Sequence, residues 1–180
     1  MIELQQPFGI ERAKDISVLV LGLGESGAAM VRWCKAQGAK VRVADTRTAD
    51  ALSESAKAYE KTVRDLGVAD IHLGQLSDDL LQGVQLIAIS PGLSPLQEPV
   101  QSFLATAQQQ EIPVWSEIEL FAQAIAALKR EQDYQVKLLA ITGTNGKTTT
   151  TALTGLLGER AGMTVGVAGK ISPAALDRLL

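Results

Sequence analysis

The chain has 180 residues, which is enough for one large domain or two small ones. Hydrophobic residues make up 46% and charged residues 21%, as is typical of a globular protein with a substantial core, so a mostly disordered chain is excluded. The net charge is −3, from 17 basic and 20 acidic residues, and this balance argues against a general nucleic-acid binder.

The sequence also predicts the cellular location of the protein. The N-terminus lacks the basic and then apolar layout of a secretory signal, and no run approaches the roughly 20 apolar residues that span a bilayer. The single cysteine, Cys34, excludes an internal disulfide, and its apolar neighbours predict a buried structural thiol. We therefore expect a cytoplasmic protein without membrane insertion.

Short apolar runs alternate with longer amphipathic runs along the first 116 residues, which predicts an α/β unit with a parallel sheet. The apolar runs predict strands at 17–21, 40–44, 69–72, 84–89 and 112–115. The amphipathic runs predict helices at 26–37, 51–66 and 99–110. Residues 1–116 are therefore expected to form an N-terminal domain.

A second unit is expected at residues 117–180, where helical patterns and apolar runs alternate again. The sequence predicts helices at 117–130 and 147–161, strands at 136–142 and 164–168, and the start of a helix at 176–180. Two strands are too few for an independent sheet of ordinary size. We therefore expect this second unit to be the beginning of a truncated domain.

The segment between the strand and the helix of the second unit has the residues of a phosphate-binding loop. Gly143 and Gly146 would let backbone N–H groups close around phosphate oxygens at the start of a helix. Lys147 would meet the β- and γ-phosphates, and the hydroxyl of Thr148 would bind magnesium. The segment predicts ATP with Mg²⁺, bound by Gly143, Thr144, Asn145, Gly146, Lys147, Thr148 and Thr149.

This loop is a shortened variant, because Ile141 stands where the strict phosphate-loop consensus has its first glycine. The alternative is a turn rich in glycine and threonine that caps a helix without any ligand. A capping turn does not require glycine, lysine and a hydroxyl in this order, so the sequence favours the nucleotide loop.

A second glycine-rich motif, G-x-G-x-x-G at residues 22–27, follows the first predicted strand and opens a helix. Asp45 closes the next strand, where a dinucleotide-binding fold places a carboxylate for the adenosine ribose. Taken alone, the motif predicts an NAD-binding domain, and a tight turn without a ligand is the alternative. The motif does not identify the nucleotide.

In this order the two motifs resemble those of the Mur ligase family, which joins amino acids to a UDP-linked muramoyl carrier with ATP. The resemblance extends over nearly the whole chain, and the ATP loop is its most specific part. It is strongest to the branch that adds D-glutamate, since the branch that adds L-alanine has histidine in place of Asn145. It is carried by residues 22–27, 45–47, 90–92, 117–120, 141–149 and 165–169.

The resemblance implies a Rossmann-like N-terminal domain that holds the UDP end of the substrate, followed by the start of a P-loop-type ATP-binding α/β domain. The diphosphate would lie at the start of the first helix, against the backbone of Glu25 and the hydroxyl of Ser26, and Asp45, Thr46 and Arg47 would hold the uridine. A polar loop at the end of a strand is the alternative for these three. The implied UDP-substrate residues are Gly24, Glu25, Ser26, Gly27, Asp45, Thr46, Arg47, Ser90, Pro91, Gly92 and Lys170.

One implied contact departs from the family's pattern, because Lys170 follows Gly169 where the family has asparagine beside the muramoyl sugar. A lysine that donates to the substrate and a solvated lysine are both open. The only histidine, His72, lies in a short predicted strand away from every motif and is expected to be structural.

The activity implied by the resemblance is a two-step ligation. The carboxylate of UDP-N-acetylmuramoyl-L-alanine attacks the γ-phosphate of ATP, and D-glutamate then displaces phosphate from the acyl phosphate. Lys147 is the expected catalytic residue, and Asn145 and Thr149 would steady the loop. We expect a monomer whose 180 residues bind the UDP-sugar weakly and show no turnover. The alternatives are another Mur ligase and an NAD-dependent oxidoreductase.

Overall fold

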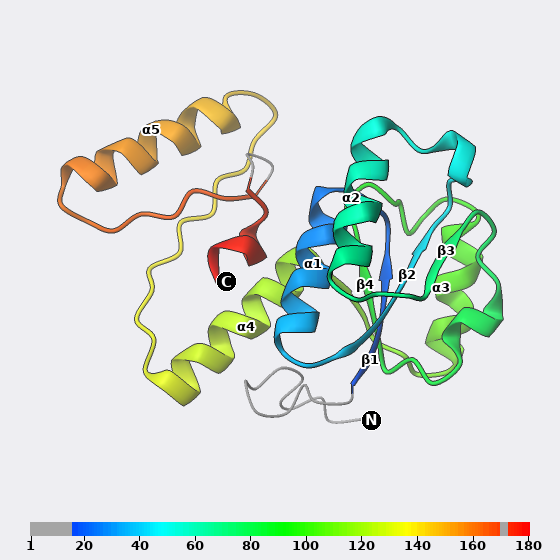
Figure 1. Cartoon of the computed structure of the whole chain (residues 1–180). Coiled ribbons are helices and arrows are strands. Elements are labelled where there is room, and N and C mark those ends of the chain that lie inside the picture. Colours follow the sequence, from blue (N-terminus) through cyan, green and yellow to red (C-terminus); the bar gives the residue numbers. More distant parts are fainter. Residues whose placement is uncertain (1–15, 170–172) are drawn as a thin grey trace.

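A five-stranded parallel sheet forms the centre of the structure, a computed structural model that describes residues 16–169 and 173–180 (Figure 1). The strand order is β3-β2-β1-β4-β5. Every neighbouring pair is parallel, with Val20 of β1 opposite Val43 of β2 and Ala88 of β4. The strands are β1 (Ser17–Leu21), β2 (Lys40–Asp45), β3 (Ile71–Leu73), β4 (Leu86–Ile89) and β5 (Val114–Ser116).

The helices confirm most of the pattern predicted from the sequence, with ends that differ by a few residues. The α-helices are α1 (Glu25–Ala36), α2 (Glu54–Asp65), α3 (Val100–Gln109), α4 (Glu117–Gln132) and α5 (Lys147–Arg160). Three short 3₁₀ turns accompany them: η1 (Ala49–Ala51), η2 (Asp78–Leu81) and η3 (Ala175–Arg178). The helix expected to begin at 176 is thus a single 3₁₀ turn. No helix within the described ranges is long and apolar enough to cross a membrane.

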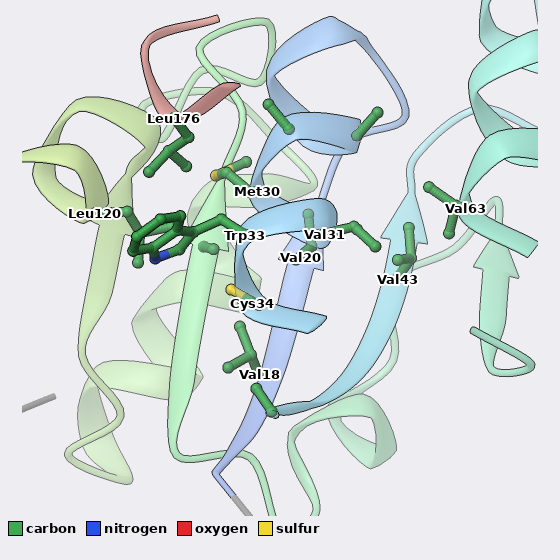
Figure 2. Packing of buried hydrophobic residues seen from close by; sticks show 14 of the residues in the cluster. Val18, Val20, Met30, Val31, Trp33, Cys34, Val43, Val63, Leu120 and Leu176 are labelled. Carbon is green, nitrogen blue, oxygen red and sulfur yellow. The ribbon is translucent and has the colours of Figure 1, made fainter. Parts of the chain in front are cut away.

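The strands of the sheet are apolar without interruption because both faces of the sheet are covered. Val18 and Val20 point toward α1, α2 and α4, where they join the first core cluster (Figure 2). Leu19 and Leu21 point to the other face and pack with α3 and η2. Cys34 is completely buried in the first cluster, and this burial raises the pKa of its thiol to about 12. The expectation of a structural thiol is confirmed.

The second unit lacks the strands that the sequence predicts at 136–142 and 164–168. Leu138 and Leu139 are exposed, and neither segment pairs with the five-stranded sheet or with the other segment. A strand is stable only when its N–H and C=O groups find a neighbouring strand, and two isolated segments do not supply one. The α5 helix instead lies beside the 165–167 segment, which its Gly155 and Gly158 approach closely.

The turn between β1 and α1 depends on the absence of side chains at two glycines. A Cβ at Gly27 would lie 1.9 Å from the carbonyl oxygen of Gly22, so the helix could not approach the strand end this closely. Gly22 has φ +103°, and a Cβ there would lie 2.8 Å from Cβ of Ser90. These contacts bring the start of α1 and the end of β4 together at the end of β1.

Replacing Gly27 with alanine is expected to lower the free energy of unfolding by about 3 kcal/mol or more, because backbone atoms must move to make room. The matched control is Gly24→Ala, where no atom lies within 4 Å of the new Cβ. The control is expected to cost about 1 kcal/mol, since alanine is a poorer helix N-cap than glycine. Urea unfolding followed by circular dichroism measures both. Equal losses in the two variants would contradict the close-packing account.

Candidate nucleotide pocket at the switch point of the sheet

A hollow of about 400 Å³ lies at the carboxyl ends of the central strands. β1 and β4 are neighbours in the sheet, and the chain runs from β1 to β2 toward one edge and from β4 to β5 toward the other edge. The crevice between the ends of β1 and β4 is therefore a topological switch point. Open parallel sheets bind their ligands at such points. The hollow is lined by Gly22, Leu23, Gly24, Asp45, Thr46, Arg47, Ser53, Ser55, Ala56, Tyr59, Ser90, Gly92 and Leu93.

The structure therefore brings together six of the residues predicted for the UDP substrate. They come from three different turns and are Gly24, Asp45, Thr46, Arg47, Ser90 and Gly92. Glu25, Ser26, Gly27 and Pro91 flank these residues in sequence but do not line the hollow. Lys170 is outside the described residues. His72 lies on β3, hydrogen-bonded to Asp70 and away from the hollow.

The start of α1 offers backbone donors beside the hollow. Its N-cap is Gly24, which has no side chain to accept from the first turn, and the first helical bond is donated by Ala28 to the Gly24 carbonyl. The N–H groups of Glu25, Ser26 and Gly27 are thus not used by the helix itself. A helix N-terminus with free donors favours an anion such as a phosphate.

Asp45, the last residue of β2, is the most constrained side chain of the site. It is only 1% exposed, and its carboxylate accepts from the backbone N–H of Leu23 at 2.6 Å. It also accepts from the N–H of Arg47 at 2.9 Å and from Nε and Nη2 of the Arg47 guanidinium at 2.8 and 2.6 Å. Burial alone would raise the pKa of Asp45, but the hydrogen bonds from Arg47 and Leu23 outweigh it and lower the pKa.

Arg47 is held in place by these bonds and by a further bond from Nη2 to the carbonyl of Leu23 at 3.0 Å. Its Nη1 makes no hydrogen bond to any of the residues that the structure describes, and the side chain is 40% exposed beside the hollow. The guanidinium thus has a fixed orientation and two N–H donors left for a ligand. Asp45, by contrast, has its acceptor positions occupied.

The β4 end contributes the Ser90–Gly92 turn. Ser90 is buried, its N–H donates to the Leu21 carbonyl at 2.9 Å, and its side chain packs against Gly22. Gly92 is exposed at the rim, and a Cβ there would meet nothing. The turn brings the backbone to the hollow without adding charge.

Sequence reasoning missed the wall that α2 contributes, which consists of Ser53, Ser55, Ala56 and Tyr59. Ser53 is the N-cap of α2 and accepts from the Ala56 N–H at 3.2 Å. The Ser53 N-cap marks only the start of a helix, and the sequence does not indicate that this start faces the end of β1. Glu117 was named only within the 117–120 motif and given no role, but it is a buried carboxylate that accepts from the Ser26 hydroxyl at 3.1 Å.

The predicted ATP loop lies apart from this hollow, before α5. Gly143 has φ +150° and Gly146 has φ +77°, which are backbone conformations that glycine adopts readily. The first helical bond is donated by Thr150 to the Gly146 carbonyl, so the N–H groups of residues 147–149 are not used by the helix. Nζ of Lys147 donates to the carbonyl oxygens of Gly143 and Thr144.

These features fit a bound triphosphate with magnesium. Donors not used by the helix, a lysine folded over the loop and the exposed hydroxyl of Thr148 are the groups that a phosphate loop supplies. Within 16–169 and 173–180 no group of three or more His, Cys, Asp or Glu side chains is placed to hold a metal ion. The exposed hydroxyl of Thr148 is an oxygen ligand of the kind that magnesium takes together with phosphate oxygens.

Replacing Asp45 with asparagine is expected to lower the free energy of unfolding by about 3 kcal/mol at pH 7, because the buried amide offers fewer acceptors to the same donors. The native protein should lose this stability as the pH falls below about 4, since a carboxylate with a lowered pKa contributes only while ionised. Urea unfolding at pH 7 and pH 3 measures both effects, and the variant should show the weaker pH dependence.

The control is the exposed Asp65, whose replacement by asparagine should change the unfolding free energy by less than about 0.5 kcal/mol. If Asp45→Asn were as stable as the native chain at pH 7, the carboxylate would not be the anchor of the site.

Comparison with known proteins gives the family. The family model described as "Mur ligase MurD-like, N-terminal domain" matches residues 16–116. A relative from Ralstonia nicotianae, named UDP-N-acetylmuramoylalanine--D-glutamate ligase, is 57% identical over 162 residues, which is 90% of this chain and 31% of the relative. A relative of the same name from Cupriavidus metallidurans is 59% identical over the same shares of the two chains. The chain thus spans about a third of the length of these relatives.

Among solved structures, a pseudomurein peptide ligase type C from Methanothermus fervidus aligns over 82% of this chain and 27% of its own, at a TM-score of 0.44 and 22% identity. That likeness is too slight to support an argument. The family match covers more than half of the chain and includes all six motif residues of the hollow. The chain belongs to the MurD-like family of Mur ligases, and residues 16–116 are its N-terminal domain.

Proposed function

We propose that the chain supplies the UDP-substrate pocket and the ATP loop of a cytoplasmic ligase that joins D-glutamate to UDP-N-acetylmuramoyl-L-alanine in peptidoglycan synthesis. The relatives that match 90% of the chain carry the name of this ligase. The observation that carries the proposal is that residues 22–24, residues 45–47, and Ser90 with Gly92, which come from three separate turns, line one hollow at the switch point.

In this proposal the diphosphate lies at the start of α1, where the N–H groups of Glu25, Ser26 and Gly27 are free of helical bonds. The uridine end lies toward Thr46 and Arg47, and Nη1 of Arg47 donates to it. Asp45 acts mainly by orienting Arg47, because its carboxylate already accepts from Leu23 and Arg47. Lys170, which belongs to the second unit, would contact the muramoyl sugar.

Residues 1–116 would form the UDP-binding domain and residues 117–180 the beginning of the ATP-binding domain. In the second, Lys147 would neutralise charge on the β- and γ-phosphates of ATP, and Thr148 would hold magnesium. The neighbours Gly143, Thr144, Asn145, Gly146 and Thr149 would supply backbone and hydroxyl donors. We expect the ligase to act as a monomer.

One observation argues against an NAD-dependent oxidoreductase. A dinucleotide site uses the carboxylate at the end of the second strand to accept from the ribose hydroxyls. Asp45 has that position, but it is 1% exposed and its oxygens are occupied by Leu23 and Arg47. The hollow therefore suits a ligand that approaches the arginine and not the carboxylate.

The pocket is tested by measuring the melting temperature of the protein at increasing concentrations of UDP and, separately, of NAD. UDP is expected to raise the melting temperature and NAD to leave it unchanged. The variant Arg47→Lys keeps a cation beside Asp45 but removes the Nη1 donors, so its affinity for UDP should fall about tenfold. The matched control is Arg64→Lys on the exposed side of α2. Stabilisation by NAD and not by UDP would refute the proposal.

The ATP loop is tested separately. Lys147→Ala should weaken binding of ATP with Mg²⁺ by at least about tenfold, because a charge-assisted bond to phosphate is lost. Lys129→Ala, an exposed lysine on α4, is the control. Fluorescence titration with a labelled ATP analogue gives both affinities, and equal affinities in the two variants would remove Lys147 from the nucleotide site.

A further inference from the structure

Glu117 is a buried carboxylate that connects three distant segments of the chain. It is the first residue of α4 and is 4% exposed. Its Oε2 accepts from the hydroxyl of Ser26 at 3.1 Å, and its Oε1 accepts from the backbone N–H of Leu176 at 3.3 Å. No lysine, arginine or histidine in the described ranges forms an ion pair with it. Both of its partners are neutral donors.

Ser26 stands in the first turn of α1, where the diphosphate is proposed to bind. Its hydroxyl has one proton and can donate to only one acceptor at a time. That proton is donated to Glu117. A phosphate at the start of α1 can only accept hydrogen bonds. Either the Ser26 hydroxyl turns from Glu117 to donate to the phosphate, or the phosphate lies against the lone pairs of the Ser26 oxygen.

We propose that Glu117 sets the affinity of the UDP pocket by competing with the bound diphosphate for the hydroxyl proton of Ser26. Glu117 is then a positioning residue, since it acts on the ligand through Ser26. This inference rests on the proposed function only in placing the diphosphate at the start of α1.

The other oxygen of Glu117 extends this effect to residues 173–180. Leu176 is fully buried and lies with Leu120 and Trp33 at the junction of α4 and α1 (Figure 2). The next residue, Asp177, accepts two hydrogen bonds from the Arg32 guanidinium of α1, at 2.8 and 2.7 Å. The start of α1 and the 173–180 segment therefore share one carboxylate, and a change in the hydrogen bond at one Glu117 oxygen alters the hydrogen bond at the other.

The variant Glu117→Gln separates the two bonds. The amide oxygen still accepts from the Leu176 N–H, while the amide NH₂ donates to the Ser26 oxygen and leaves the hydroxyl proton free for the ligand. Isothermal titration of the 180-residue chain with UDP is expected to give an affinity about tenfold higher than that of the native chain. Removing the negative charge contributes to this gain, so a second substitution is needed.

The second substitution is Ser26→Ala, which removes the hydroxyl that Glu117 and the diphosphate would compete for. With Glu117 in place, loss of the hydroxyl should change the UDP affinity by less than about threefold, because the hydroxyl donates to Glu117 and is not free for the phosphate. In the Glu117→Gln background the same substitution should cost about tenfold, since a free donor to phosphate is then lost. Glu119→Gln removes a charge from the same turn at an exposed position and should leave the affinity unchanged. Additive effects of Ser26→Ala and Glu117→Gln would overturn the competition.

A native chain that does not bind UDP would refute the proposed function, and the competition with it. The tie between Glu117 and Leu176 is judged independently by amide hydrogen exchange without ligand. Exchange at Leu176 should accelerate about tenfold or more in Glu117→Ala and stay near the native rate in Glu117→Gln. Native protection of Leu176 in Glu117→Ala would show that the carboxylate does not hold this segment.

Discussion

The buried carboxylate of Asp45 is the interaction on which the candidate site depends. It fixes the turn after β1 through the Leu23 N–H and fixes the loop after β2 through the backbone and side chain of Arg47. A carboxylate in this position would be destabilising without these donors. Their presence converts two strand ends into one rigid wall of the hollow, with an arginine whose remaining donors face a ligand.

A second constraint is the lack of a side chain at Gly22 and Gly27. The helix, the strand end and the Ser90 turn come within distances that any Cβ at these positions would prevent. The first-turn N–H groups of α1 thereby lie beside the hollow. Free N–H donors at the helix start and an oriented guanidinium held next to the β1–α1 turn together favour a ligand with a phosphate at one end and hydrogen-bond acceptors at the other.

Much of this could be predicted from the sequence because the signals are local. Apolar runs such as Ser17–Leu21 give parallel strands covered on both faces, and the glycine spacing at 22–27 gives the turn that opens α1. The bond between Ser26 and Glu117 joins residues 91 positions apart, and no local pattern indicates it. A glutamate followed by a helical pattern is usually solvated, so its burial depends on packing between α1 and α4. The segments at 136–142 and 164–168 have strand-like sequences, but without a neighbour to pair with they do not become strands.

The central claim is that UDP lies between the start of α1 and the Arg47 loop. Its most direct test is a titration of the ¹⁵N-labelled chain with UDP, followed through the amide resonances. We expect the amide resonances of residues 24–27, 46–47, 90 and 92 to shift together with a single dissociation constant. Shifts confined to residues 143–149, or to the surface away from the switch point, would contradict it.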